Sequence, residues 1–182
     1  MKFGTYFAYW EREWDADYFK YIEKVSKLGF DVLEVSGAGI LEMDDDQLAK
    51  LKKAASDAGI MMTGCYGVPK SMDVSSVNEE TRSKGLETLK KMIVKLNKAG
   101  IDRLGGIMYA YWPVDYSEPV EKDKVRAISI ESVRELADFA KPYGITLELE
   151  VVNRFEQFMF NDAAEAVQFC KDVDRENVKV ML

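Results

Sequence analysis

The sequence contains no histidine among its 182 residues. This absence excludes, within the chain, the Ser-His-Asp and Cys-His arrangements of nucleophilic catalysis and every histidine-ligated metal site. Cysteine is scarce too, and Cys65 and Cys170 form neither a disulfide framework nor a zinc-binding spacing. We interpret them as two reduced, partly buried thiols. Chemistry in this chain must therefore use carboxylates, hydroxyls, lysines or groups supplied by a partner.

Positive charge and long apolar runs are also lacking. The 25 Lys and Arg residues face 32 Asp and Glu residues, a net charge of −7, which disfavours a nucleic-acid partner because phosphate binding needs a basic face. No apolar run approaches the roughly 18 residues that span a bilayer, and the first residues lack the pattern of a signal peptide. Length and composition predict a single globular unit over residues 1–182, which we expect in the cytoplasm and without membrane contact.

One pattern recurs along the chain: a helical stretch ends in glycine, and a short apolar run follows at once. Glycine suits the left-handed residue that closes a helix, and the Val, Ile, Leu and Met that follow it are typical of buried strands. Apolar residues three and four positions apart predict helices between these strands. The junctions lie at Gly29, Gly59, Gly100 and Gly144.

The pattern predicts six strands that alternate with five helices. We expect strands at 3–9, 31–36, 60–66, 103–109, 145–151 and 177–182, and helices at 15–28, 46–58, 78–99, 124–141 and 161–173. Acidic or amide residues at 44–46 and 161–162 supply helix N-caps. Strict alternation predicts an α/β fold with a parallel sheet, either open and doubly wound or rolled into a (β/α) barrel.

The loops after the strands favour the barrel. The turn after the first strand has no glycine, which excludes the phosphate-binding loops of nucleotide-binding folds. Aromatic and acidic residues follow the strands instead, at the face where a TIM barrel builds its site. A complete TIM barrel has eight strands and eight helices in roughly 250 residues. We therefore expect an incomplete barrel, cut short after its sixth strand, whose two open sheet edges favour self-association.

The densest candidate site lies in residues 146–158, TLELEVVNRFEQF. Glu148 and Glu150 share one face of the predicted strand, and Glu150 stands at its carboxyl end, where barrels bind ligands. Glu156 follows in the next loop. Two acids near one mouth could bind a divalent cation or divide the acid and base roles. Equally, Glu148 and Glu150 could be solvated and pair with lysines, and the periodicity leaves both interpretations open.

Aromatic residues cluster after two of the predicted strands. Tyr6 and Trp14 belong to the first cluster, and Trp112 belongs to the cluster after the fourth strand. Such rings line pockets that hold the apolar face of a sugar, but they pack between loops and helices at least as often. Gly105 and Gly106 predict a close backbone approach at the end of the fourth strand.

The order and spacing of these motifs resemble those of the ketose 3-epimerases, the group of D-tagatose and D-allulose (D-psicose) 3-epimerases. The resemblance covers the whole chain and rests on YFAYWEREW, KLGFDVLEV, GCYG, GGIMYAYWPVDY, LEVVNRFE and NVKVML. It implies a xylose-isomerase-like TIM barrel that inverts C3 of a free ketose, such as D-fructose to D-allulose or D-tagatose to D-sorbose. It also implies a divalent metal, manganese or cobalt, and a homo-oligomer.

The resemblance implies roles for individual residues. Glu150 is implied to be a metal ligand and one of two acid/base carboxylates, and Glu156 to hold the hydroxyl end of the sugar. The residues implied to line the substrate pocket are Tyr6, Trp14, Cys65, Ile107 and Trp112.

The resemblance also implies that part of the family's site is missing. The family's other ligands, an Asp, a His and a second catalytic Glu, are expected beyond Leu182, together with its substrate-binding His and Arg. The implied Asp would follow Leu182 directly. We therefore expect an incomplete metal site and a chain that is inactive in C3 epimerisation.

Two other functions remain open. A related metal-dependent sugar isomerase would move the carbonyl group between C1 and C2, although the YWPVD and NRFE motifs disfavour it. A non-catalytic barrel fragment or engineered scaffold would instead self-associate through its open sheet edges.

Overall fold

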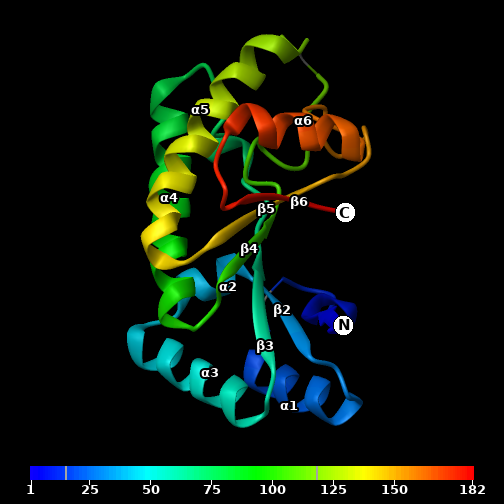
Figure 1. Cartoon of the computed structure of the whole chain (residues 1–182), viewed down its shortest axis with the longest axis vertical. Helices are drawn as coiled ribbons and strands as arrows, with labels where there is room; N and C mark the ends of the chain where they lie inside the picture. Colours follow the sequence, from blue (N-terminus) through cyan, green and yellow to red (C-terminus); the bar gives the residue numbers. More distant parts are fainter. Residues whose placement is uncertain (15, 118) are drawn as a thin grey trace.

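A computed structural model describes residues 1–14, 16–117 and 119–182. Its centre is a parallel sheet in the order β1-β2-β3-β4-β5-β6, so each strand pairs with its neighbours in sequence (Figure 1). A doubly wound sheet reverses its strand order near the middle, whereas this order runs in one direction, as in the wall of a (β/α) barrel. The strands are β1 (Gly4–Tyr6), β2 (Val32–Ser36), β3 (Met61–Cys65), β4 (Arg103–Gly106), β5 (Thr146–Glu150) and β6 (Val178–Met181).

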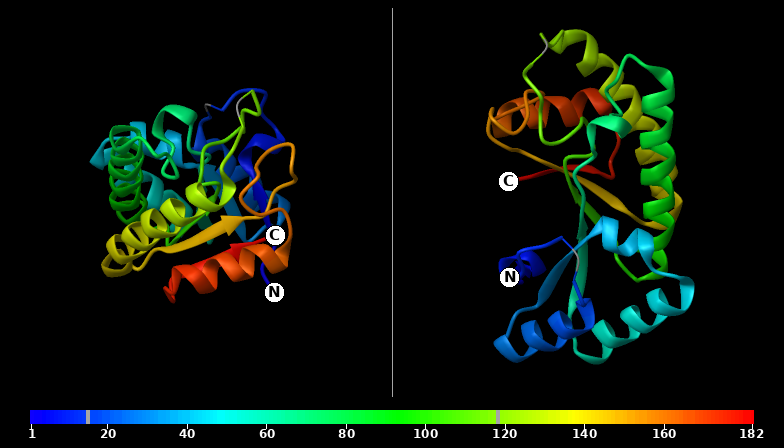
Figure 2. Two further views of the ribbon diagram at one scale, coloured as in Figure 1. Left: turned by 90° about the horizontal axis from the view of Figure 1, so that it is seen from above. Right: turned by 180° about the vertical axis from the view of Figure 1, so that it is seen from behind.

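Helices cover the outer side of this sheet, and both termini lie on its open side (Figure 2). The contacts follow the alternation of the chain, with α4 packed between α3 and α5, and α6 packed against β6. Among the described residues, no helix is long and apolar enough to cross a bilayer. The helices are α1 (Tyr18–Leu28), α2 (Gly37–Glu42), α3 (Asp45–Asp57), α4 (Glu79–Lys98), α5 (Lys122–Ala140) and α6 (Ala163–Val173).

The predicted helix ends are confirmed. All four junction glycines have the left-handed backbone expected of them, with φ between 67° at Gly144 and 81° at Gly29. Asp44 caps α3 through a capping box with Gln47, and Asp162 caps α6 by accepting a hydrogen bond from the backbone N–H of Glu165 at 2.8 Å. Local chemistry therefore determines where these helices begin and end.

Three predicted boundaries are wrong. The first strand ends at Tyr6 rather than at 9, because Phe7 turns into the core against Tyr18 and the chain forms a short 3-10 helix, Phe7–Tyr9. The fourth strand ends at Gly106 rather than at 109. The helix predicted from 15 begins at Tyr18, and residue 15 lies outside the described residues.

The sixth strand also stops short of its predicted end at Leu182. It ends at Met181, whose register partner Glu150 is the last residue of β5, so the ladder between the two strands stops there. Leu182 follows the strand and is 87% exposed. The predicted strand is therefore confirmed to within one residue at each end.

One helix was not predicted, since α2 follows β2 directly and brings the number of α-helices to six rather than five. Two of its six residues are Gly37 and Gly39, which are poor helix formers. The remaining predicted elements agree with the structure within one or two residues at each end.

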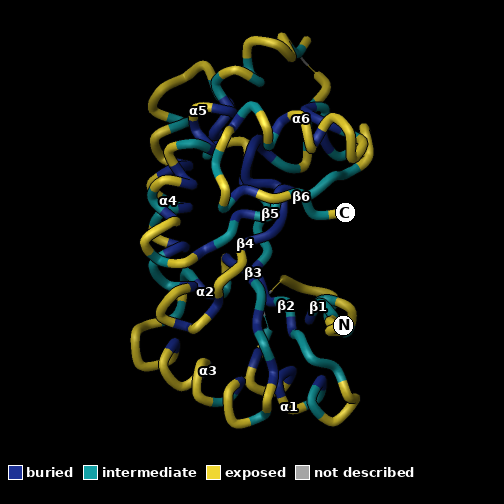
Figure 3. Tube along the Cα trace, viewed as in Figure 1, coloured by how far each residue is buried: buried dark blue, intermediate teal, exposed yellow. Residues whose placement is uncertain are grey.

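The core lies between the outer face of the sheet and the helices (Figure 3). Leu33 and Val35 on β2 point to this side and are fully buried, as are Leu147 and Leu149 on β5. The residues between them face the inside of the curved sheet, because successive side chains of a strand alternate. The inner face is therefore polar. Glu148 there accepts a hydrogen bond from the Arg103 guanidinium of β4 at 2.6 Å.

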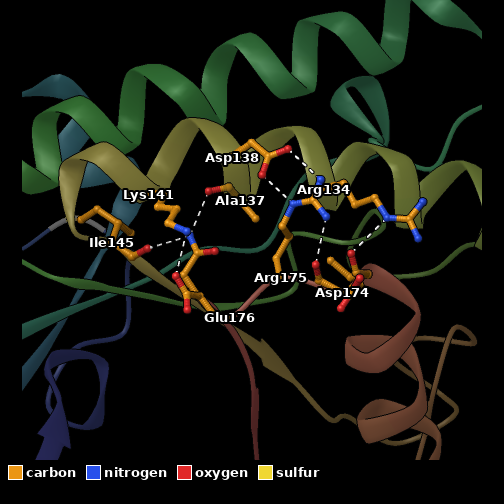
Figure 4. A network of polar contacts seen from close by, with 10 residues as sticks. Arg134, Ala137, Asp138, Lys141, Ile145, Asp174, Arg175 and Glu176 are labelled. Atoms are coloured by element: carbon orange, nitrogen blue, oxygen red, sulfur yellow. Dashed lines mark hydrogen bonds and ion pairs between the residues drawn. The ribbon is translucent and has the colours of Figure 1, made fainter.

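A polar network joins α5 to the turn before β6 (Figure 4). The Arg175 guanidinium donates to both carboxylate oxygens of Asp138, at 2.5 and 2.9 Å. The Arg134 Nε donates to the backbone carbonyl of Val173 at the end of α6, at 3.0 Å. These contacts lie at the amino-terminal end of β6, and they hold α6 and β6 against α5.

The two outer strands have open edges. Within the described residues, β1 pairs only with β2, and β6 pairs only with β5. The predicted open edges, and the expected incomplete barrel of six strands, are confirmed.

Candidate active site

A cavity of about 380 Å³ opens at the carboxyl ends of the strands. The structure brings all seven residues predicted for the site into its lining. They come from six different segments of the chain, which meet at this end because parallel strands deliver their following loops to one face. The seven are Tyr6, Trp14, Cys65, Ile107, Trp112, Glu150 and Glu156.

Strand β4 ends in two glycines, of which Gly106 lines the cavity. Gly106 has φ +106°, and a Cβ atom there would lie 2.6 Å from the backbone oxygen of Tyr66. A Cβ atom on Gly105 would lie 2.9 Å from the sulfur of Met181, which reaches across from β6. The predicted close approach at these glycines is confirmed, because the backbone of Tyr66 and the side chain of Met181 occupy the positions that a Cβ atom would take.

Trp112 and Glu156 are joined by a hydrogen bond in the lining of the cavity. The indole N–H of Trp112 donates to one carboxylate oxygen of Glu156 at 3.1 Å, and the side-chain amide of Asn153 donates to the other at 2.6 Å. Two loops, after β4 and after β5, thus orient one carboxylate. These two hydrogen bonds fix the orientation of the Glu156 carboxylate in the lining of the cavity.

Glu150 ends β5 inside the cavity and is half-buried. Its backbone carbonyl accepts a hydrogen bond from the hydroxyl of Tyr109 at 2.9 Å, and Tyr109 is itself packed between Phe160 and Phe169. Burial raises the pKa of the Glu150 carboxyl, and the negative charge of Glu156 raises it further. Within the described part of the chain no donor reaches this carboxylate, so only its backbone carbonyl is held by a hydrogen bond.

Glu148 has a different environment from Glu150, although both lie on the same face of β5. It forms an ion pair with Arg103 and does not line the cavity. Each of the two interpretations left open by the sequence therefore applies to one residue. Glu148 forms an ion pair with a cation, whereas Glu150 lines the cavity.

Tyr6 and Cys65 line the cavity with a hydroxyl and a thiol whose pKa values are both raised. Burial raises the pKa of the Cys65 thiol to about 12, and Glu34 and Glu150 add to the effect. Burial likewise raises the pKa of the Tyr6 hydroxyl well above its ordinary value. At neutral pH both groups keep their protons, so Cys65 is a neutral part of the lining and not a thiolate nucleophile.

The aromatic residues divide between the two roles that the sequence left open. Trp14 is 62% exposed at the rim and tilts against Tyr6, with ring centroids 6.3 Å apart. Trp10, from the same loop, instead stacks on Tyr21 at 5.7 Å and lies beneath the ammonium group of Lys24. Packing accounts for Trp10, and the cavity accounts for Trp14.

One carboxylate of the cavity was not predicted. Glu34 lies on β2 beside Tyr6 in the sheet register, and its carboxylate accepts a hydrogen bond from the Thr63 hydroxyl at 3.2 Å. Burial raises the pKa of Glu34; the Thr63 contact opposes this, and the charges of Glu150 and Glu148 reinforce it. The signal was present in VLEVS, which alternates as TLELE does. Ser36, Tyr66 and Met181 also line the cavity and were missed.

The described residues do not make up a metal centre by themselves. In residues 1–14, 16–117 and 119–182, no group of three or more His, Cys, Asp or Glu side chains is placed to hold a metal ion. Glu150 is the one residue for which the family resemblance implies a metal bond. Manganese or cobalt therefore stays a prediction, and the acid and base groups in the lining of the cavity are carboxylates.

The end of β6 contributes an apolar wall rather than a ligand. Met181 lines the cavity, whereas the exposed Leu182 does not, and its side chain carries no metal-binding atom. The ligands that the resemblance implies beyond Leu182 likewise stay a prediction.

Comparison with known proteins identifies the class to which this barrel belongs. The profile of the family described as xylose isomerase-like TIM barrel matches residues 22–182, so the chain belongs to that family. Within it, the chain is 45% identical to the D-psicose 3-epimerase of Agrobacterium fabrum and 43% identical to that of Ruminiclostridium cellulolyticum, each over 182 residues. These alignments cover 100% of this chain and 63% and 62% of the two relatives.

Solved structures agree with the sequence comparison. The crystal structure of D-psicose 3-epimerase from Clostridium cellulolyticum H10 with D-tagatose matches with a TM-score of 0.98 at 43% identity, over 100% of this chain and 63% of that one. A D-psicose 3-epimerase in the presence of D-fructose matches with a TM-score of 0.97 at 45% identity, with the same coverage. The predicted resemblance to ketose 3-epimerases is confirmed, and the chain spans a little under two thirds of the length of these relatives.

Proposed function

We propose that this chain binds a free ketohexose in the cavity and serves the epimerisation of that sugar at C3. The observation that supports this most is the meeting of Glu150, Glu156 and Trp112 in one cavity. An aromatic face beside oriented carboxylates is typical of a site that holds a sugar by its C–H face and its hydroxyls. The names of the relatives, D-psicose 3-epimerases, support the same substrate class.

In the proposed reaction, Glu150 acts as the base at C3. The C3 proton lies next to the C2 carbonyl, so its removal gives an enediolate. A base works best when its pKa is near the working pH, and burial moves the pKa of Glu150 in that direction. Glu156, fixed by Trp112 and Asn153, accepts hydrogen bonds from the hydroxyl end of the sugar and so presents C3 to Glu150.

Inversion needs a second proton carrier on the opposite face of C3. Glu150 serves one face only, so on its own it can remove and return a proton without changing the configuration. We therefore expect the chain alone to exchange the C3 hydrogen of a ketose without forming the epimer. Manganese or cobalt remains an implication of the family resemblance, with Glu150 as its recognised ligand in this chain.

The test is hydrogen exchange in D₂O. D-fructose is incubated with the purified chain, proton NMR follows the C3 signal, and chromatography measures D-allulose. We expect loss of the C3 signal with the unaltered chain and none with Glu150→Gln. Equal exchange by both proteins contradicts the role of Glu150, and exchange at C1 instead of C3 supports the isomerase alternative. Formation of D-allulose that disappears in Glu150→Gln means that a partner copy supplies the second face.

We also propose self-association as a second candidate function of this chain. The unpaired outer edges of β1 and β6 support it, because an open edge presents unsatisfied N–H and C=O groups to another strand. In this alternative the chain is a scaffold that assembles through its edges without catalysis. Absence of ketose binding combined with concentration-dependent assembly would favour this function over the first.

A further inference from the structure

Glu34 is the carboxylate of the cavity for which the proposed reaction has no use. It stands on the inner face of β2, with Tyr6 and Thr63 as its register partners on the two adjacent strands. It is partly buried in the lining of the same cavity as Glu150. A carboxylate in such a place is costly unless donors reach it, so its surroundings indicate what it binds.

The two sides of the cavity differ. Glu150 stands with Glu156 and Trp112 on the side of β5, whereas Glu34 stands with Tyr6 on the side of β1 and β2. The strands between them are β3 and β4, and Gly106 of β4 contributes no side chain to the lining. Glu150 and Glu34 therefore line one cavity from two sides, and a ligand in this cavity has a carboxylate on each side.

The hydrogen bonds of Glu34 are incomplete without a ligand. An ionised carboxylate has about four acceptor positions, and the Thr63 hydroxyl, at 3.2 Å, is the one donor that reaches it from the described residues. Lysine and arginine are absent from the described lining, so no cation neutralises its charge there. Neutral hydroxyl donors satisfy such a group, whereas an anionic ligand meets three carboxylates of the same sign.

We propose that Glu34 is a substrate-binding residue that accepts hydrogen bonds from the ketose hydroxyls farthest from Glu150. This inference rests on the proposed function and extends it. It assigns the C4 to C6 part of the ketose to the side of β1 and β2, since Glu156 holds the opposite hydroxyl end.

Tryptophan fluorescence measures the binding, because Trp14 and Trp112 both line the cavity. The full chain is titrated with D-fructose, and the affinity is compared with that of Glu34→Gln. A hydrogen bond to a charged group contributes about 1.5–3 kcal/mol, so we expect a roughly ten- to hundredfold loss of affinity. The matched control is Glu148→Gln, which removes a carboxylate from the same face of the sheet but outside the cavity, and which we expect to keep the affinity.

The ligand is varied in the same assay. The deoxy sugars tested are 4-deoxy-, 5-deoxy- and 6-deoxy-D-fructose. We expect one of them to bind the unaltered chain and Glu34→Gln with equal affinity, because it lacks the hydroxyl that donates a hydrogen bond to Glu34. D-fructose 6-phosphate should bind the unaltered chain more weakly than D-fructose. Circular dichroism confirms that the variants are folded.

The outcomes separate the two proposals. If D-fructose causes no saturable change with the unaltered chain, the proposed function is wrong, and the role of Glu34 is refuted with it. If D-fructose binds and Glu34→Gln keeps the affinity, only the role of Glu34 is wrong. If Glu34→Gln does not fold, the deoxy sugars decide with the unaltered chain. The inference is then contradicted if none of the three deoxy sugars binds at least tenfold more weakly than D-fructose.

Discussion

Replacing Gly106 with alanine tests the close approach of β4 to the chain that follows β3. The new Cβ atom would lie 2.6 Å from the backbone oxygen of Tyr66, 3.0 Å from its backbone nitrogen and 3.1 Å from the sulfur of Cys65. The first two neighbours are backbone atoms and cannot rotate away. The strands must therefore separate locally, and the wall of the cavity moves with them.

The expected loss of stability has two parts. A non-glycine residue at φ +106° costs about 1–3 kcal/mol of backbone strain. Displacing packed neighbours adds about 1–3 kcal/mol, as for other overpacked sites. We expect Gly106→Ala to lower the free energy of unfolding by about 2–6 kcal/mol, which is a large fraction of the 5–15 kcal/mol typical of a globular protein.

Gly29→Ala is the matched control. Gly29 also has a positive φ, +81°, but an added Cβ atom would have no heavy atom within 4 Å. Its cost is the left-handed strain alone, about 1–2 kcal/mol. Urea denaturation followed by far-UV circular dichroism measures both variants, and the difference between them isolates the steric contact at β4.

Ketose binding gives a second measurement of the same substitution. Because Tyr66 and Cys65 both line the cavity, Gly106→Ala should weaken D-fructose binding while Gly29→Ala leaves it unchanged. An equal loss of stability in the two variants, with ketose binding preserved in both, would refute the reasoning from the close approach.

Three further predictions concern the site and the sheet edges. Trp112→Phe removes the N–H donor to Glu156 and should weaken D-fructose binding about tenfold in calorimetry; unchanged affinity would show that the Trp112 N–H is not needed to orient Glu156. Glu150→Gln should stabilise the chain at pH 7 but not near pH 3. Because burial raises the folded-state pKa of Glu150, its ionisation costs stability as the pH rises above the ordinary value of 4.5. Thermal melts at both pH values check the sign, and a variant less stable at pH 7 than the unaltered chain contradicts it. The unpaired edges of β1 and β6 predict concentration-dependent association in sedimentation, and a monomer that persists at high concentration argues against open edges.

The strands were predictable from the sequence because their apolar residues alternate. Leu33 with Val35, and Leu147 with Leu149, point to the helices and are fully buried, so the period of two follows directly from the packing. Helix α2 was not predictable in this way. Its glycines disfavour a helix locally, but their lack of side chains lets Tyr18 and Met92 pack against it. Here the tertiary contacts outweigh the local preference.

The candidate site divides along a similar line. Glu150 could be placed at the mouth from strand periodicity alone, but the roles of the seven predicted residues came from the resemblance and remain predictions. Glu34 carries the same periodicity in β2, yet a single acid on a strand is equally typical of a solvated position. Its burial depends on the curvature of the sheet, which brings β2 and β5 to one cavity, and curvature is a property that no single strand encodes.

The strictly sequential strand order also has a consequence for how the chain folds. Register partners lie about 30 to 40 residues apart, from Gly4 and Val32 in the first pair of strands to Arg103 and Thr146 in the fourth. No strand waits for a distant segment before it can pair, so contacts form between near neighbours along the chain. During synthesis, the pairing partner on the amino-terminal side of each strand has therefore already been made when that strand emerges, so the order allows the sheet to form from β1 toward β6.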